Sequence, residues 1–188
     1  MSKIAKFLIA DFKRDWTNPS IKFFRSSGAY GYIIWLTIMN AHFEKIDLTI
    51  EKIVNDVKSS KDLANIIKEY GGIPVMCRTG HSYIKMRMKE INAILGGEMS
   101  GHIFFKDRWF GFDDGIYAGL RMLEIISNSN KTSSEIFNEL PKSYSTPELN
   151  ITVNKDGFQH EFMKKFASEA NFIDAKISKI DGVRADFA

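Results

Sequence analysis

The stretch that decides the fold is Lys52–Cys77, KIVNDVKSSKDLANIIKEYGGIPVMC. Apolar residues at its start indicate a short strand (Ile53, Val54 and Val57), and Ser60 can cap a helix whose apolar residues share one face (Leu63, Ile66, Ile67 and Tyr70). The pair Gly71-Gly72 should end that helix, and Ile73–Cys77 reads as a second apolar strand. A strand, a helix and a strand over about 25 residues form a βαβ unit, which predicts parallel strands with a right-handed crossover.

The carboxyl ends of two parallel strands lie at the same edge of a sheet, where ligands of open α/β proteins collect. Lys58 follows the first strand, and Arg78, Gly80 and His81 follow the second. A lysine and an arginine at such an edge suit a phosphate, and histidines there can move protons near neutral pH. The sequence therefore predicts a polar site at this edge.

The pattern continues with a second helix, in which Ser82 is a candidate cap and Ile84, Met88, Ile91 and Leu95 recur at helical spacing up to Gly96-Gly97. His102–Phe105 is expected to be a third strand. Asp113 or Asp114 should cap a third helix that buries Ile116, Leu120, Leu123 and Ile126. Residues 51–130 are thus predicted to form a three-layer α/β domain with a mixed, mainly parallel sheet.

Different patterns flank this domain. Residues 1–50 contain a possible amphipathic helix but carry no functional signal. Residues 131–147 read as a linker with a short helix, which Thr132 and Glu135 can cap and Pro141 should stop. Residues 148–188 suggest a partial α+β domain, which we expect to be the truncated start of a longer one: strand 149–153, helix 157–170, and strands 175–180 and 183–187.

The loop Gly96–His102 is the strongest local indication of a ligand. On an extended segment Glu98, Ser100 and His102 alternate and share a face. A carboxylate that accepts two hydrogen bonds and a hydroxyl that both donates and accepts suit a polyhydroxylated ligand. The alternative is a glycine-rich connector whose polar side chains are merely solvated.

Bulk properties exclude several classes. A net charge of +3 is too mild to argue for nucleic acid, and no apolar run is long enough to cross a membrane. The single cysteine, Cys77, excludes an internal disulfide and fits a reducing cytoplasm; its position at the end of an apolar strand favours a buried thiol over a nucleophile.

Other polar residues have simpler explanations. The cations Lys85 and Lys89 fit the solvated face of a helix, and we interpret His42 and His160 as structural or surface residues. The adjacent acids Asp113-Asp114 are better explained by helix capping than by a metal, since no third carboxylate lies nearby at ligand spacing. No metal site is therefore predicted.

Three runs together resemble the third domain of the bacterial α-D-phosphohexomutase family (phosphomannomutase/phosphoglucomutase): RTGHS at 78–82, GEMSGH at 97–102 and GFDDGIY at 111–117. The likeness extends from residue 52 to about residue 127. It continues through PELN at 147–150 and DGVR at 181–184 into the start of the fourth domain.

The resemblance implies roles for individual residues. It implies that Glu98 and Ser100 hold sugar hydroxyls, and that Lys58, His81 and His102 occupy active-site positions. Together with Arg78 for the phosphate, these form the expected site. Met99 resembles the mannose/glucose type of the family.

The resemblance also implies an isomerase, an intramolecular phosphotransferase that interconverts hexose 1-phosphate and hexose 6-phosphate with magnesium. Phosphoryl transfer depends on positioning and charge neutralisation. We find neither the phosphoserine loop nor the aspartate-rich magnesium loop of such enzymes in this sequence. The expectation is a fragment of the mutase class, with a possible partner chain supplying the missing domains; the alternatives are a non-catalytic sugar-phosphate-binding or assembly module and a nonfunctional remnant.

Overall fold

The computed structural model describes residues 51–140, 148–152 and 157–187. The chain divides into two compact units, Met1–Lys142 and Ser143–Ala188. The expectations for residues 1–50 and for residues 141–147 of the linker, including the stop at Pro141, lie outside the described residues.

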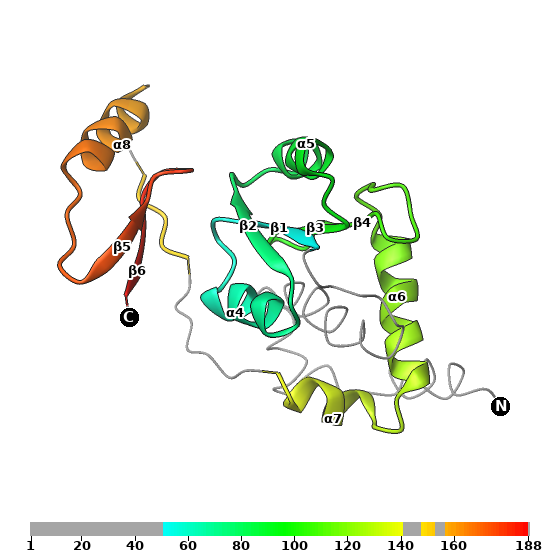
Figure 1. The fold of residues 1–188 in the computed structure, drawn as a ribbon. Coiled ribbons are helices and arrows are strands. Elements are labelled where there is room, and N and C mark those ends of the chain that lie inside the picture. Colours follow the sequence, from blue (N-terminus) through cyan, green and yellow to red (C-terminus); the bar gives the residue numbers. More distant parts are fainter. Residues whose placement is uncertain (1–50, 141–147, 153–156, 188) are drawn as a thin grey trace. The chain divides into compact units, whose positions relative to one another are not determined.

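A four-stranded sheet organises the first unit, with the strand order β2-β1-β3-β4 (Figure 1). Its strands are β1 (Lys52–Asp56), β2 (Ile73–Cys77), β3 (Leu95–Gly97) and β4 (Ile103–Phe105). β1 is parallel to both β2 and β3, whereas β4 is antiparallel to β3. The predicted parallel pairing and the mixed, mainly parallel sheet are both confirmed.

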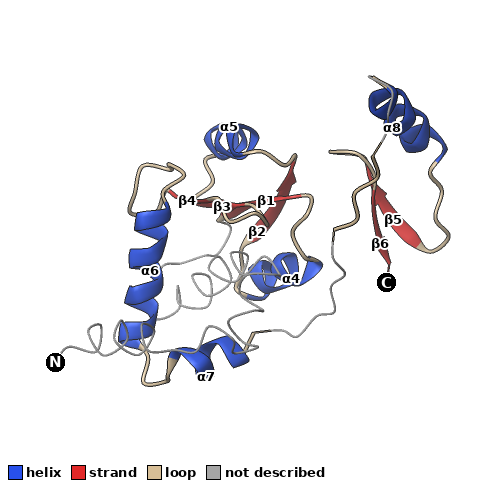
Figure 2. Ribbon diagram, turned by 180° about the vertical axis from the view of Figure 1, so that it is seen from behind, coloured by secondary structure: helices blue, strands red, loops and turns tan. Residues whose placement is uncertain are grey.

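Helices cover both faces of this sheet, which gives the three layers predicted from the sequence. Figures 1 and 2 both show α5 (His81–Ile91) on the opposite side of the sheet from α4 (Lys61–Glu69). The other helices among the described residues of this unit are α6 (Gly115–Asn128) and α7 (Ser133–Asn138). Ser60 caps α4 as predicted, its hydroxyl accepting from the Asp62 N–H.

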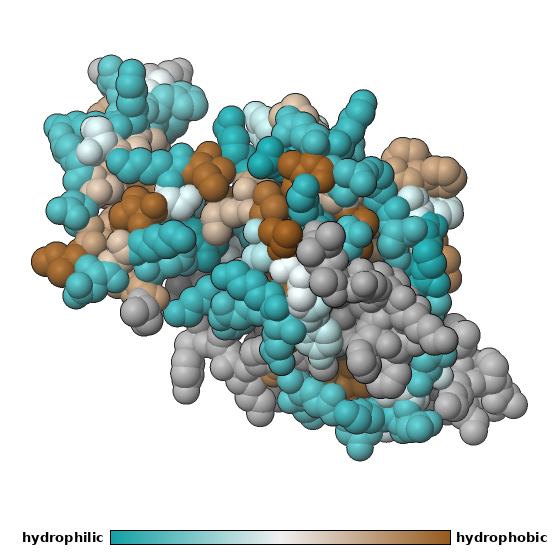
Figure 3. All heavy atoms as spheres, in the orientation of Figure 1, coloured by the Kyte–Doolittle hydropathy of each residue, from teal (hydrophilic) through white to brown (hydrophobic). Residues whose placement is uncertain are grey.

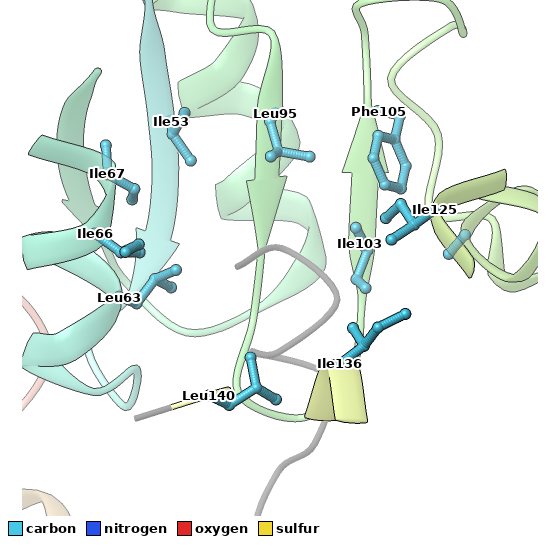
Figure 4. Close-up of a cluster of buried hydrophobic side chains, with 11 residues drawn as sticks. Ile53, Leu63, Ile66, Ile67, Leu95, Ile103, Phe105, Ile125, Ile136 and Leu140 are labelled. Carbon is cyan, nitrogen blue, oxygen red and sulfur yellow. The ribbon is translucent and has the colours of Figure 1, made fainter. Parts of the chain in front are cut away.

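The core consists of two apolar clusters, one on each face of the sheet. Alternating residues of one strand enter different clusters, as the pleat requires: Ile53 packs with α4, α6 and α7, whereas Val54 packs with α5. Figure 4 shows the first cluster, in which side chains from α4 and from β4 lie on opposite sides. The labelled residues of this cluster are Ile53, Leu63, Ile66, Ile67, Leu95, Ile103, Phe105, Ile125, Ile136 and Leu140. Phe104 is fully buried in the second cluster.

The prediction that Gly96-Gly97 ends the second helix is wrong. α5 ends at Ile91, because Asn92 adopts a left-handed conformation, and its N-cap is Gly80 rather than Ser82. Gly96 instead lies in β3, and a Cβ built on it would be 2.5 Å from the Met88 sulfur. Glycine at this position therefore allows α5 to pack closely against the sheet.

The predicted buried side of the third helix is also wrong in part. Asp114 caps α6 as expected, but Ile116 and Leu120 are 82% and 57% exposed. The buried residues of α6 are Ala118, Arg121 and Ile125. Arg121 can be buried because its guanidinium is paired with Asp107 at 2.6 Å and stacks over Phe105 at 4.8 Å. A purely apolar template misses such a paired cation.

The short helix α7 has the predicted capping box. Thr132 accepts from the Glu135 N–H, and the Glu135 carboxylate accepts from the Thr132 N–H. Side chains over α4 and α7 are mostly hydrophilic on the face shown in Figure 3, as expected for solvated helix surfaces. No helix within the described ranges has the length and apolar character needed to cross a bilayer.

The second unit contains helix α8 (Phe158–Glu169) and an antiparallel hairpin of β5 (Ala175–Ser178) and β6 (Arg184–Phe187). These elements confirm the predicted helix and the two last strands. The predicted strand at 149–153 is wrong over its described part, since residues 149–152 are not in a strand and Leu149 and Ile151 are 86% and 89% exposed. The phenylalanines of α8 are in register as predicted, and Phe162 and Phe166 are stacked.

Candidate functional site

Three parallel strands end at the same edge of the sheet, and the segments that follow them touch one another. The Thr79 hydroxyl, after β2, lies 3.5 Å from a carboxylate oxygen of Asp56 at the end of β1. The Gly80 N–H donates to the Glu98 carboxylate, after β3, at 3.0 Å. The predicted convergence at one edge is therefore present in the structure.

Asp56 is the centre of this arrangement, and the sequence interpretation missed it. Its fully buried carboxylate accepts from the Ser59 hydroxyl at 2.5 Å and from the Met99 N–H at 3.3 Å, in addition to its contact with Thr79. One side chain thus joins the segments after all three parallel strands. The polar pair Asn55-Asp56 at the end of an otherwise apolar strand was the available signal.

Glu98 lies inside the site rather than on its surface. The residue is only 3% exposed, and its two carboxylate oxygens accept from the Gly80 N–H and from the Ser100 hydroxyl, the latter at 3.1 Å. Glu98 therefore links the loop after β3 to the start of α5 and holds Ser100, which is exposed. Its direct contact with a sugar stays a prediction.

The loop itself is a tight hairpin turn between β3 and β4. The Glu98 N–H donates to the His102 carbonyl at 2.9 Å, and the Gly101 N–H donates to the Glu98 carbonyl at 3.0 Å. Gly101 has a φ of 106°, a conformation that a side chain would strain. This geometry fixes the positions of Ser100 and His102 relative to Glu98.

The two histidines of the expected site lie close together. The ring centroids of His81 and His102 are 6.0 Å apart. His81 is the first residue of α5, and both histidines are exposed. His102 Nδ1 lies 2.6 Å from the carboxylate of Asp113, so this aspartate pairs with a histidine while its neighbour Asp114 caps α6. The sequence interpretation of these acids as caps holds for Asp114 alone.

The expected cations lie in the segments after β1 and β2. Lys58 is exposed in the turn that follows β1, two residues after Asp56. Arg78 is exposed directly after β2, and its guanidinium lies 4.5 Å from the ring centroid of Tyr83. Lys85 and Lys89 are exposed on α5, which agrees with a solvated helix face.

The sequence also raised a metal site, the Cys77 thiol and His160 for consideration. None of the described histidines, cysteines and acids forms a group of three that could hold a metal ion. Cys77 is partly buried beside the second apolar cluster, and desolvation raises the pKa of its thiol. A raised pKa disfavours the thiolate that a nucleophile requires. His160 is exposed on α8, in agreement with a surface residue.

Comparison with known proteins places the chain in a family. Residues 30–144 match the profile described as phosphoglucomutase/phosphomannomutase, alpha/beta/alpha domain III. The chain is 53% identical over 137 residues to a phosphoglucomutase of Neisseria meningitidis serogroup A, a match that covers 72% of the chain and 30% of the relative. It is 49% identical over 135 residues to a phosphomannomutase/phosphoglucomutase of Pseudomonas aeruginosa, covering 72% of the chain and 29% of the relative.

A solved structure agrees with these sequence relatives. A phosphoglucomutase/phosphomannomutase family protein from Burkholderia thailandensis superposes with a TM-score of 0.71 at 36% identity, covering 86% of the chain and 32% of that protein. The chain thus spans about a third or less of the length of the proteins it matches. On this evidence the chain belongs to the phosphoglucomutase/phosphomannomutase family, through its α/β/α domain III.

Proposed function

We propose that this chain supplies the hexose-phosphate recognition of a phosphomannomutase/phosphoglucomutase, which interconverts hexose 1-phosphate and hexose 6-phosphate in carbohydrate metabolism. One observation carries the proposal. The loop that bears Ser100 and His102 is bonded, through the buried Glu98, to the turn that bears Arg78 and His81. Groups able to bind hydroxyls, phosphate and protons are thereby held at one edge of a rigid sheet.

Each exposed group of this edge has a chemical part in the proposal. The Ser100 hydroxyl donates its proton to Glu98, which holds it in place, and its oxygen accepts from a sugar hydroxyl. The cations Lys58 and Arg78 attract the phosphate, since charge-assisted hydrogen bonds to phosphate are stronger than neutral ones. His81 and His102 exchange protons with the ligand near neutral pH.

Magnesium is implied by the proposed reaction, but the described residues contain no group of three ligands for it. We therefore assign no step of the reaction to the ion through these residues. The phosphoserine and the magnesium ligands would come from other domains or from a partner chain. A second candidate is a non-catalytic module that binds sugar phosphate, because recognition alone requires only the residues of the described edge.

We further propose that the protein works in the cytoplasm and uses neither nucleic acid nor a membrane as a partner. The single cysteine and the mild net charge of +3 support this.

Calorimetric titration of the chain with mannose 1-phosphate and glucose 1-phosphate tests the recognition, with free mannose as the control for the phosphate. Binding should weaken in Ser100→Ala and Glu98→Gln. It should be unchanged in Ser168→Ala, whose hydroxyl is bonded to the Lys165 carbonyl on α8. If neither phosphate ester binds, both candidate functions fail.

A turnover assay then separates the two candidates. The chain is incubated with mannose 1-phosphate, magnesium and a hexose bisphosphate, and the formation of mannose 6-phosphate is followed. Turnover that disappears in Ser100→Ala supports the mutase. Binding without turnover supports the recognition module.

A further inference from the structure

The two ring nitrogens of His102 have different surroundings, and this difference points to a specific role for Asp113. Nδ1 lies 2.6 Å from a carboxylate oxygen of Asp113, while the His102 side chain is 46% exposed. We propose that Asp113 is a positioning residue that holds neutral His102 as the Nδ1–H tautomer, and so makes Nε2 the atom that accepts a proton from the ligand. The proton donor, a hydroxyl of a hexose phosphate, rests on the proposed function.

The backbone holds Asp113 in place from both directions along the chain. On one side Asp113 forms an isolated antiparallel bridge with Phe104, which is fully buried. On the other side the next residue, Asp114, caps α6 by accepting from the Tyr117 N–H at 2.9 Å. An aspartate between a sheet bridge and a helix cap has little freedom to move its carboxylate away from His102.

His102 is restrained as well. Its carbonyl accepts from the Glu98 N–H in the hairpin turn, and Ile103, the next residue, is buried in β4. Asp113 is bonded to Nδ1 of the ring, and the centroid of the His81 ring lies 6.0 Å from that of His102. Restraint of both residues by separate elements argues for a maintained contact rather than a chance surface pair.

The chemistry of the pair determines the tautomer. An ionised carboxylate only accepts hydrogen bonds, so the contact requires a proton on Nδ1. In the neutral imidazole the lone pair is then on Nε2. When Nε2 takes a proton from a ligand hydroxyl, the ring becomes an imidazolium that keeps its Nδ1–H bond to Asp113. The Asp113 carboxylate stays ionised and stabilises the positive charge, as the aspartate of a Ser-His-Asp triad does.

Nitrogen-15 NMR of the imidazole rings tests this inference in the complete chain without any ligand. Spectra are recorded at a pH above the range in which ordinary imidazoles titrate, and the signals of His102 are identified by their loss in His102→Gln. In the unmodified chain the unprotonated nitrogen should be Nε2. In Asp113→Ala it should change to Nδ1, because histidines in water favour the Nε2–H form.

A matched control separates the hydrogen bond from a general loss of charge. Asp114→Asn removes the same charge one residue away, while its amide oxygen can still accept from the Tyr117 N–H and so keep the cap next to Asp113. It should leave the His102 tautomer unchanged. An equal change in both variants overturns the inference, as does an unmodified chain with Nδ1 unprotonated.

A second variant covers the possibility that Asp113→Ala does not fold. Asp113→Leu is close to aspartate in size but has no hydrogen-bond acceptor, and it should lower the Nδ1–H fraction of His102; an unchanged fraction overturns the inference. The measurement is independent of sugar binding. If no hexose phosphate binds but the tautomers behave as expected, the proposed function fails while the role of Asp113 stands.

Discussion

Two sets of polar side chains meet at the carboxyl edge of the sheet, and they differ in burial. The inner set consists of Asp56, Ser59 and Glu98, which are 0%, 7% and 3% exposed. The outer set consists of exposed side chains, namely Lys58, Arg78, His81, Ser100 and His102. The inner set bonds the loops to one another, whereas the outer set is accessible to a ligand.

This difference in burial predicts that substitutions in the inner set mainly lower stability, whereas substitutions in the outer set mainly weaken ligand binding. A buried carboxylate is tolerated only where its hydrogen bonds are satisfied, so removing it leaves buried donors without acceptors. An exposed side chain exchanges its contacts with water at little cost. The following predictions test this separation.

Asp56→Ala should have the largest effect. Three donors lose their acceptor, those of Ser59, Thr79 and Met99, and the free energy of unfolding should fall by about 3 kcal/mol. Urea denaturation followed by circular dichroism measures the loss. The control Glu69→Ala removes an exposed carboxylate from the end of α4 and should cost less than about 0.5 kcal/mol. Equal losses in both variants would contradict the separation.

Gly96→Val should have the next largest effect, about 2 kcal/mol of destabilisation, because its side chain meets Met88 and Ile84 in a packed core. The matched control is Gly119→Ala on α6, where an added Cβ meets nothing within 4 Å. Since alanine favours a helix over glycine, Gly119→Ala should stabilise by about 0.5–1 kcal/mol. Thermal unfolding should give a lower midpoint temperature for Gly96→Val and a higher one for Gly119→Ala. An unchanged midpoint in Gly96→Val would contradict the close approach of α5 to β3.

Arg78→Ala tests the outer set. Its affinity for mannose 1-phosphate should fall about tenfold, or roughly 1.4 kcal/mol, with stability changed by less than about 0.5 kcal/mol. The affinity lost should shrink at high salt, because exposed charges are screened. Lys85→Ala removes an exposed cation from α5 and should alter neither quantity. A large loss of stability in Arg78→Ala would contradict the separation, because it would mean that Arg78 stabilises the fold as the inner set does.

The smallest effect concerns an exposed carboxylate that has strong partners. The backbone N–H and then the hydroxyl of Thr132 lower the pKa of Glu135 below its usual 4.5. A group with a lowered folded pKa stabilises the fold above its unfolded pKa, and this contribution is lost as the pH falls through the folded value. Below pH 4.5, Glu135→Gln should therefore lose less stability on acidification than the unmodified chain, as urea titrations at several pH values would measure. Equal slopes would contradict the capping contribution.

The helices and strands of the first unit could be predicted where the apolar residues followed a single helix or strand periodicity. Leu63, Ile66 and Ile67 lie at helical spacing in α4 and are buried as expected. The pattern failed where tertiary contacts override it. The pattern predicts a helix end at Gly96, because an isolated sequence does not show that α5 packs directly over this residue. It predicts burial of Ile116 and Leu120, because the pairing of Arg121 with Asp107 cannot be seen from spacing.

The sequence predicts where the candidate site lies, but it does not predict which of its polar residues are buried and which are exposed. The βαβ pattern indicated the correct edge for Arg78 and His81, since parallel strands end together. It did not show that Glu98 is buried, because alternation along a strand says which residues share a face and not how a turn folds back. The pattern does not point to Asp56, because two of its three partners, Thr79 and Met99, lie in segments far away in sequence.

The hairpin between β3 and β4 also limits how this loop can change in related proteins. Gly97 pairs with Ile103, and Phe104 and Phe105 enter opposite faces of the sheet. Loss or gain of one residue in the turn would shift the register of β4 by one residue and move each of its side chains to the opposite face of the sheet. Substitution can therefore replace side chains such as Met99 or Ser100, while the number of residues between the strands stays constant.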